Sequence, residues 1–324
     1  MLTTEAALLL QQWQSGQAAF TVSSSGTTGV PKPFILKRNL IELSCRLTAN
    51  ALGIGAQDRI YCCLPLDKVG GMMQLFRAMV WNIPIDVVQA SANPLLHYTG
   101  DASIVSLTPM QLGLVLQNHE SKAALKRFRL VLLGGAGLSA ELEAELQHWE
   151  KPLFYHTYGM TETYSHIALR QAGKETAFRF ILPTETDTDA SGRFRFRNEL
   201  TENQWLQTND CANILPDGRF IITGRADNII NSGGIKIQPE AVEAMIATHS
   251  GLKENTFFCA GLPDSVLGEK LVLVLPEGTN PPDLAAIPFA NAYLRPKEIV
   301  FRKTFLFTET NKLKRRETLL LSGT

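Results

Sequence analysis

The pattern of apolar and polar positions divides the chain into two parts, and the first part extends to about residue 177. In it, short apolar runs alternate with segments whose apolar residues recur at helical spacing. Short apolar runs predict buried strands, and helical spacing predicts amphipathic helices. The predicted strands are 60–63, 83–88, 103–107, 130–133 and 153–156, and the predicted helices are 2–14, 46–52, 72–81, 110–118 and 140–149. This succession is typical of an α/β domain with a largely parallel sheet.

The pattern of apolar and polar positions changes from about residue 178. Residues 193–197 alternate arginine with phenylalanine, and the pair Asp217 and Gly218 separates two short apolar runs. An Asp-Gly pair between such runs predicts an antiparallel hairpin. After Gly224 the pattern predicts a smaller α+β unit, with a helix at 239–248 and strands near 256–260 and 271–275. The pattern therefore predicts a large α/β domain followed by a small α+β domain.

Composition and charge narrow the class of protein. With 324 residues and 45% hydrophobic content, the chain can bury a core large enough for two domains. Lys plus Arg equals Asp plus Glu at 31 each, so no net field favours nucleic acid or an anionic membrane. The first helix lacks a basic leader and is too short to span a bilayer. We expect no nucleic-acid or membrane partner, and the sequence does not indicate an oligomeric state.

The cysteines indicate the redox compartment. They are Cys45, Cys62, Cys63, Cys211 and Cys259, with neither a disulfide framework nor a metal-ligand spacing. This usage predicts a reduced, cytoplasmic protein.

A run rich in Ser, Thr and Gly at 23–32 carries the strongest chemical signal. Its backbone amides can converge on phosphate oxygens, and its hydroxyls and one lysine add further donors. The Walker A pattern is absent, and the alternative reading is a solvated loop of the same composition. The candidate phosphate-binding residues are Ser24, Ser25, Gly26, Thr27, Thr28, Gly29 and Lys32.

The order of residues in this run resembles the phosphate loop of the acyl-adenylate-forming enzymes, the superfamily of acyl-CoA ligases, luciferases and peptide-synthetase adenylation domains. Other segments follow in the superfamily's order. Gly134, Gly135 and Ala136 end an apolar strand and resemble the segment that lies against adenine. The alternative for these three is an ordinary strand-to-helix turn.

Residues 158–163 also match the superfamily. The resemblance implies that Tyr158 offers its ring to adenine, that Gly159 lets the backbone approach, and that Thr161 binds the α-phosphate. It assigns Glu162 as an oxygen ligand for Mg²⁺. The alternative for Glu162 is a helix-capping acid.

The resemblance implies a ribose site at Asp210 and Arg225. A carboxylate can accept from both ribose hydroxyls. Asn209 stands where relatives usually have glycine, and the alternative is a surface ion pair between Asp210 and Arg225.

Residues 224–243 resemble the start of the superfamily's mobile C-terminal domain. The implied domains are an adenylating domain over 1–226, reduced at its N-terminus relative to the superfamily, and a mobile domain over 227–324. Asp227 falls at the hinge, where one residue absorbs the backbone change. Gly233 and Gly234 fall where a thin segment lets the thiol approach. The alternative for the two glycines is a turn before a helix.

Residues 308–316 resemble the superfamily's C-terminal lysine signature. Lys312 aligns with the lysine that bridges the attacking carboxylate and the α-phosphate. Leu306 replaces the usual proline and Asn311 the usual glycine, and asparagine can still adopt a left-handed conformation. The alternative for Lys312 is a solvated basic helix, and we expect Lys314, Arg315 and Arg316 to be solvated.

The reaction implied has two steps. A carboxylate attacks Mg-ATP to form an acyl-adenylate and pyrophosphate, and coenzyme A then displaces AMP. Segments 64–71, 158–170 and 231–240 look most like the compact o-succinylbenzoate-CoA ligases of menaquinone biosynthesis. The alternatives are a ligase for another aryl or fatty acid, or a nucleotide-binding relative without turnover. The implied small molecules are a carboxylic acid, ATP, Mg²⁺ and coenzyme A.

A second carboxylate on the acid would need a cationic partner if it were buried. Relatives usually carry histidine where this chain has Lys68, at the inner wall of the acyl pocket. We therefore assign Lys68 to that carboxylate, with Arg77 as the second candidate. The alternative is that Lys68 points to solvent.

Overall fold

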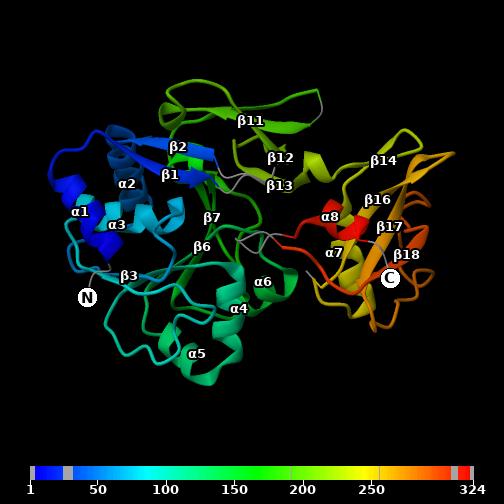
Figure 1. Ribbon diagram of the computed structural model, residues 1–324, viewed down its shortest axis with the longest axis horizontal. Coiled ribbons are helices and arrows are strands. Elements are labelled where there is room, and N and C mark those ends of the chain that lie inside the picture. Colours follow the sequence, from blue (N-terminus) through cyan, green and yellow to red (C-terminus); the bar gives the residue numbers. More distant parts are fainter. Residues whose placement is uncertain (1–3, 25–31, 191, 255, 308–312, 322–324) are drawn as a thin grey trace. The chain divides into compact units, whose positions relative to one another are not determined.

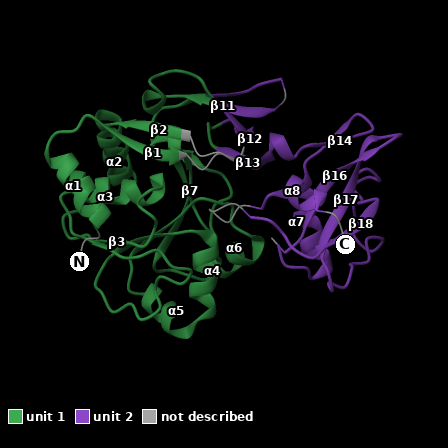
Figure 2. Ribbon diagram, viewed as in Figure 1, with its two compact units in different colours: residues 1–185, 196–206, 217–219 green, residues 186–195, 207–216, 220–324 purple. Residues whose placement is uncertain are grey.

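The computed structural model describes residues 4–24, 32–190, 192–254, 256–307 and 313–321. The contacts divide the chain into two units, coloured green and purple in Figure 2. Unit 1 comprises residues 1–185, 196–206 and 217–219, and unit 2 comprises 186–195, 207–216 and 220–324. Unit 2 thus includes chain segments that precede residue 227. The boundary of the moving parts at 226/227 stays a prediction.

Unit 1 is built on a seven-stranded sheet in the order β4-β3-β5-β6-β7-β8-β9. Its strands are β3 (Ile60–Cys62), β4 (Ile85–Val87), β5 (Ile104–Leu107), β6 (Leu130–Leu133), β7 (Leu153–Met160), β8 (Ser165–Gln171) and β9 (Arg179–Phe180). The pairs from β4 through β7 are parallel, and the pairs β7–β8 and β8–β9 are antiparallel. The predicted α/β class with a largely parallel sheet is confirmed, and two antiparallel pairs make the sheet mixed.

Helices cover this sheet because the strands are apolar on both faces. Successive side chains of a strand point to opposite faces. Tyr61, Val105 and Val131 join a core cluster with residues of α4 (Pro109–Gln117), α5 (His119–Leu125) and α6 (Ala140–Gln147). Their neighbours Ile60 and Ile104 face the other way and are also buried. On that side α3 (Val69–Trp81) contacts β3 and β8, and α2 (Arg38–Leu52) contacts β8.

The helix ends follow local signals that the hydrophobic pattern does not carry. At α4, Thr108 and Gln111 form a reciprocal capping box, with Pro109 at the first helical position. The helices α2 and α3 end at left-handed residues, Gly53 and Asn82. The structure adds α5, which the sequence analysis missed, and starts α2 at Arg38 instead of residue 46. The predicted N-terminal helix is α1 (Thr4–Gln14).

An antiparallel pair, β1 (Ala19–Ser24) and β2 (Lys32–Lys37), flanks the predicted phosphate loop. Ser24 is paired with Lys32 at its end. In Figure 1 this blue pair lies beside α2, in agreement with the contact between α2 and β2. The loop expected over 23–32 is corrected at its ends, because backbone pairing places Ser23, Ser24 and Lys32 in strands. Residues 25–31 lie outside the described residues.

A four-stranded sheet holds the predicted hairpin around Asp217 and Gly218. Its strands are β10 (Glu185–Thr188), β11 (Arg193–Arg197), β12 (Leu206–Ile214) and β13 (Phe220–Arg225), in that order. The pairing of β12 with β13 is antiparallel. This confirms the hairpin that the Asp-Gly pair predicted.

The rest of unit 2 is a five-stranded sheet with a helix on each face. Its strands are β14 (Ile230–Ser232), β15 (Ile235–Ile237), β16 (Phe258–Asp264), β17 (Gly268–Pro276) and β18 (Glu298–Arg302). One face packs Val242 and Ile246 of α7 (Pro239–Ser250) against Cys259 and Leu273. The other face packs Leu319 of α8 (Arg315–Leu320) against β16 and β17. The small α+β unit is confirmed. In the part of the chain that the structure describes, no helix is both long and apolar enough to cross a bilayer.

Candidate functional site

In unit 1, the predicted adenine segment lies at the carboxyl end of β6. Open α/β sheets bind ligands beyond the carboxyl ends of their parallel strands. Thr157 of the neighbouring β7 donates its hydroxyl to the Leu133 carbonyl, at 3.0 Å. A Cβ on Gly134 would lie 2.7 Å from that same hydroxyl oxygen, and Gly135 has φ +88°. Both glycines are therefore needed for this turn, which leaves Gly135 and Ala136 exposed.

The segment 158–162 begins within the neighbouring strand β7 and extends just beyond its end. A Cβ on Gly159 would lie 2.0 Å from the Ser165 carbonyl oxygen, so glycine is required by the pairing of β7 with β8 as well as by any bound nucleotide. The Thr163 hydroxyl accepts from the Met160 amide at 2.9 Å and fixes the short 3₁₀ helix η1 (Thr161–Thr163). This turn holds Thr161 and Glu162 at the end of β7. The structure thus brings the adenine segment and the Tyr158–Glu162 segment to adjacent parallel strands.

A magnesium ion would have to share its ligands with a bound nucleotide. No group of three or more His, Cys, Asp or Glu residues in the described ranges could hold a metal by itself. Mg²⁺ prefers oxygen ligands and is commonly bound by one or two carboxylates together with substrate phosphates. Glu162, half-buried in the middle of η1, fits such a single protein ligand.

The predicted ribose residues lie in unit 2. Asp210 and Arg225 are direct cross-strand partners of β12 and β13, which places their side chains side by side. Arg225 donates to Asp210 from Nη1 at 3.1 Å. It also holds both carboxylate oxygens of Asp227, at 3.0 and 2.9 Å, from Nε and Nη2. The ion pair considered as an alternative is therefore present, and Asp227, at the predicted hinge in η3 (Ala226–Asn228), belongs to the same cluster.

The predicted thiol-path glycines form a two-residue hairpin turn. Ser232 of β14 pairs with Ile235 of β15, and Gly233 and Gly234 connect them with φ +60° and +82°. Positive φ at both central residues is typical of a type I′ turn, which glycine favours. A Cβ on Gly234 would meet no atom within 4 Å. The constraint at Gly234 is thus backbone conformation, while the space beside it is open.

Several predicted site residues cannot be placed. Ser25, Gly26, Thr27, Thr28 and Gly29 of the phosphate loop, and Lys312, lie outside the described residues. For Ser24 and Lys32 the structure describes the backbone pairing alone.

The two predicted acyl-pocket cations have different surroundings. Lys68 precedes α3, and its amino group lies 3.4 Å from the Asp67 carboxylate. Arg77, two turns along α3, is only 3% exposed. Its Nη2 donates to Ser165 Oγ at 2.8 Å and lies 3.3 Å from His166 Nδ1. No carboxylate among the described residues pairs with Arg77, and its Nε has no hydrogen-bond partner.

His166 is the neutral partner of this guanidinium. Arginine can only donate, so His166 Nδ1 is the acceptor and Nε2 carries the hydrogen. Nε2 lies 3.0 Å from Thr48 Oγ1, which donates to the Ser44 carbonyl at 2.9 Å. Burial, followed by the charge of Arg77, lowers the pKa of His166 well below its ordinary value. Burial also lowers the pKa of Arg77.

The expectation for Arg315 is wrong. Its side chain is 20% exposed, and it pairs with both oxygens of Glu243, the second at 2.8 Å. It also donates to the Cys259 carbonyl at 3.1 Å. The run of basic residues gave no local signal of this burial, because Glu243 lies 72 positions earlier in the chain.

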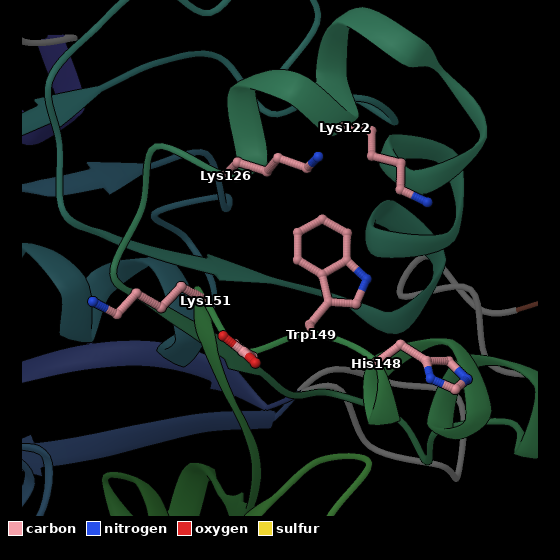
Figure 3. Close-up of a pocket in the computed structure, with 6 residues that line it drawn as sticks. Lys122, Lys126, His148, Trp149 and Lys151 are labelled. Carbon is pink, nitrogen blue, oxygen red and sulfur yellow. The ribbon is translucent and has the colours of Figure 1, made fainter.

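Unit 1 also contains a separate hollow. It measures about 550 Å³ and is lined by Lys122, Lys126, His148, Trp149, Glu150 and Lys151. Figure 3 shows the amino groups of Lys122 and Lys126 on the side of the Trp149 ring, while Lys151 and His148 point away from it. Lys122 pairs with Glu145 at 2.8 Å. None of the predicted site residues lines this hollow.

The sequence matches the model of a known family, described as AMP-binding enzyme, over residues 6–190. The chain belongs to this family. A crystal structure of an acyl-CoA synthetase (AMP-forming)/AMP-acid ligase II-like protein from Dyadobacter fermentans is 32% identical, and the match covers 97% of this chain and 93% of that one, with a TM-score of 0.65. The superfamily inferred from the motifs, and with it an AMP-forming ligase, is confirmed.

Two further relatives share less sequence identity with this chain. A 2-succinylbenzoate--CoA ligase from Listeria monocytogenes is 26% identical over 343 residues, which cover 97% of this chain and 72% of the relative. The o-succinylbenzoate CoA synthetase of Bacillus subtilis, solved with its acyl-adenylate intermediate, is 22% identical. That match covers 93% of this chain and 69% of the other with a TM-score of 0.79. It shows that the two chains share a fold.

Proposed function

We propose that this AMP-binding enzyme joins 2-succinylbenzoate to coenzyme A in two steps, with ATP and Mg²⁺. The acid's carboxylate attacks the α-phosphorus and pyrophosphate leaves. The thiol of coenzyme A then attacks the acyl carbon and AMP leaves. The names of the Listeria and Bacillus relatives support this substrate.

The observation that carries the substrate proposal is the buried charge of Arg77. A guanidinium in a protein interior is costly unless a charge compensates it. Its partners, Ser165 and His166, are neutral, and they lie at the start of β8, separated by one residue from the segment 158–163 assigned to the nucleotide. A dicarboxylic acid bound beside this segment would supply the missing negative charge. Lys68 already has Asp67 beside it, so the structure favours Arg77 over Lys68 for this role.

The other assigned residues would bind and orient the nucleotide. The turn at Gly134 and Gly135 would receive the adenine, with Tyr158 offering its ring on the neighbouring strand. Asp210 and Arg225 would hold the ribose, and Thr161 would contact the α-phosphate. Mg²⁺, held by Glu162 and phosphate oxygens, would offset negative charge on the phosphates. Holding the acid and ATP in line would provide a large part of the acceleration.

Pyrophosphate release from a panel of acids tests the proposal. The panel should contain 2-succinylbenzoate, a monocarboxylic analogue of the same shape, benzoate and a long-chain fatty acid, each with and without coenzyme A. We expect 2-succinylbenzoate to have the highest kcat/KM and thioester to form only with coenzyme A. Preference for benzoate or the fatty acid would favour the alternative ligases, and nucleotide binding without pyrophosphate release would favour a non-catalytic relative.

Substitution of the two cations tests the substrate contact. Arg77→Met should raise KM for 2-succinylbenzoate at least ~10-fold more than KM for the monocarboxylic analogue, because only the former loses a charge partner. Lys68→Met is the matched comparison, and we expect a smaller difference between the two acids. Equal effects of Arg77→Met on both acids would remove Arg77 from the carboxylate site.

A further inference from the structure

The carbonyl of Ala136, in the turn assigned to adenine, contacts a buried histidine on the neighbouring strand. His156 Nε2 lies 3.0 Å from the Ala136 carbonyl oxygen. His156 belongs to β7 and is only 7% exposed. Together with the Thr157 hydroxyl on Leu133, this contact fastens both ends of the turn to β7.

The partners of His156 determine its tautomer. Nη2 of Arg170, on β8, lies 2.9 Å from His156 Nδ1. Arginine has no acceptor, so Nδ1 must accept and the ring hydrogen must be on Nε2. Nε2 therefore donates to the Ala136 carbonyl, which can only accept. Burial, followed by the charge of Arg170, lowers the pKa of His156 to about 4, so the ring is neutral at physiological pH.

Arg170 is itself held from two sides. Its Nη2 pairs with Glu143 of α6, and its Nη1 donates to the Glu175 carbonyl at 2.7 Å. The second oxygen of Glu143 accepts from the Gly173 amide at 2.6 Å. Contacts other than the one with His156 therefore hold the Arg170 guanidinium in place.

The side chains around His156 also contact Tyr158, the residue assigned to the adenine ring. The Phe178 ring lies 5.1 Å from the His156 ring and 5.8 Å from the Tyr158 ring, measured between centroids. Arg170 lies over the Phe178 ring at 5.3 Å. One buried group of side chains therefore supports the Ala136 turn by a hydrogen bond and contacts Tyr158 by packing.

We propose that His156 is a positioning residue for nucleotide binding: its Nε2 hydrogen holds the Ala136 turn at the spacing from Tyr158 that an adenine ring requires, and Arg170 and Glu143 hold His156 in that state. The inference rests on the proposed function in so far as the turn receives adenine. It does not depend on which acid is the substrate.

Binding of AMP, followed by isothermal titration calorimetry, tests the inference without any acid or coenzyme A. His156→Leu removes both hydrogen bonds of the ring and should weaken AMP binding roughly 3- to 10-fold, the loss expected for one hydrogen bond. His156→Gln keeps a donor toward Ala136 and an acceptor toward Arg170, and should stay within about 2-fold of the wild type. Arg170→Met combined with His156→Leu should bind no more weakly than His156→Leu alone, because both act through one contact.

Phe154→Leu is the control for a merely structural effect. Phe154 lies two residues earlier on the same strand and belongs to a buried core cluster of unit 1. This variant should lower the melting temperature and leave AMP affinity unchanged. In ligation assays, His156→Leu should raise KM for ATP while KM for the acid stays constant.

Two results would overturn the inference. The first is AMP affinity of His156→Leu equal to that of the wild type. The second is a wild-type protein that binds no AMP. Absence of ligation with AMP binding intact would overturn only the proposed function, and the calorimetric comparison would still decide the role of His156.

Discussion

At the scale of single residues, three arginines differ in what neutralises them. Arg225 meets two aspartates, and Arg315 meets two oxygens of Glu243. Arg77 meets only neutral groups among the described residues. A paired arginine stabilises the surrounding structure, whereas a buried unpaired one retains its attraction for an anion. This difference makes Arg77 the residue most directly tied to the proposed substrate.

Lys312 has a role that half-reactions can isolate. Lys312→Ala should lower acyl-adenylate formation by ~10²- to 10³-fold, because it removes a donor where charge develops in the transition state. Conversion of supplied acyl-adenylate to thioester should continue. Lys314→Ala is the matched control, since Lys314 pairs with Glu317 at 3.0 Å. Equal loss in both half-reactions would refute the assignment of Lys312.

At the scale of elements, substitutions in the β14–β15 hairpin can separate the backbone conformation of the turn from the access of the thiol. Asparagine tolerates positive φ, whereas leucine does not. Gly234→Asn should therefore keep the turn, add a side chain in open space, and slow thioester formation from supplied acyl-adenylate while pyrophosphate release is unaffected. Gly234→Leu should slow the same step more and lower the melting temperature as well. Normal thioester formation by Gly234→Asn would exclude this turn from the thiol path.

The 3₁₀ turn η3 offers a test of the predicted hinge. Asp227→Pro fixes φ and removes a backbone donor, so it should impair thioester formation more than adenylation if rotation at this residue separates the two steps. The substitution also removes the carboxylate that holds Arg225. Asp227→Ala removes the carboxylate and leaves φ free. Its effects on adenylation and on thioester formation should therefore be more nearly equal. Identical behaviour of the two variants would show that the ion pair matters and the hinge does not.

At the scale of the whole molecule, buried neutral histidines predict sensitivity to acid. The folded pKa of His156 is about 4, below its ordinary value of 6.5, chiefly because of burial. The unfolded chain therefore takes up a proton that the folded chain refuses as pH falls from about 6.5 to about 4. Stability is full above this window and lost within it, by about 3 kcal/mol for this residue alone. His166 acts in the same direction.

Urea denaturation between pH 7 and pH 4.5 measures this loss. The free energy of unfolding should decrease steadily as the pH is lowered. His156→Gln should reduce the slope of this dependence by up to about 1.4 kcal/mol per pH unit, because one titrating group is gone. An unchanged slope in His156→Gln would mean that folding does not lower the pKa of His156.

Much of the molecule follows from neighbouring residues alone. Short apolar runs predicted the strands β3, β5, β6 and β7, and helical spacing predicted the helices α3, α4, α6 and α7, because both signals depend only on residues close together in the chain. The Asp-Gly pair gave the β12–β13 hairpin through the turn that glycine permits. The order of motifs gave the family before any fold was known.

Only the tertiary structure decided which polar groups are buried and with whom. The bond from Arg77 to Ser165 spans 88 positions of sequence, and that from Arg315 to Glu243 spans 72. The link between His156 and Ala136 depends on the parallel register of β6 and β7. Local patterns report how often a side chain faces the core. Desolvation and the choice of partner depend on groups that meet only when the chain has folded, so the charge states and contacts of the site could not be predicted from the sequence.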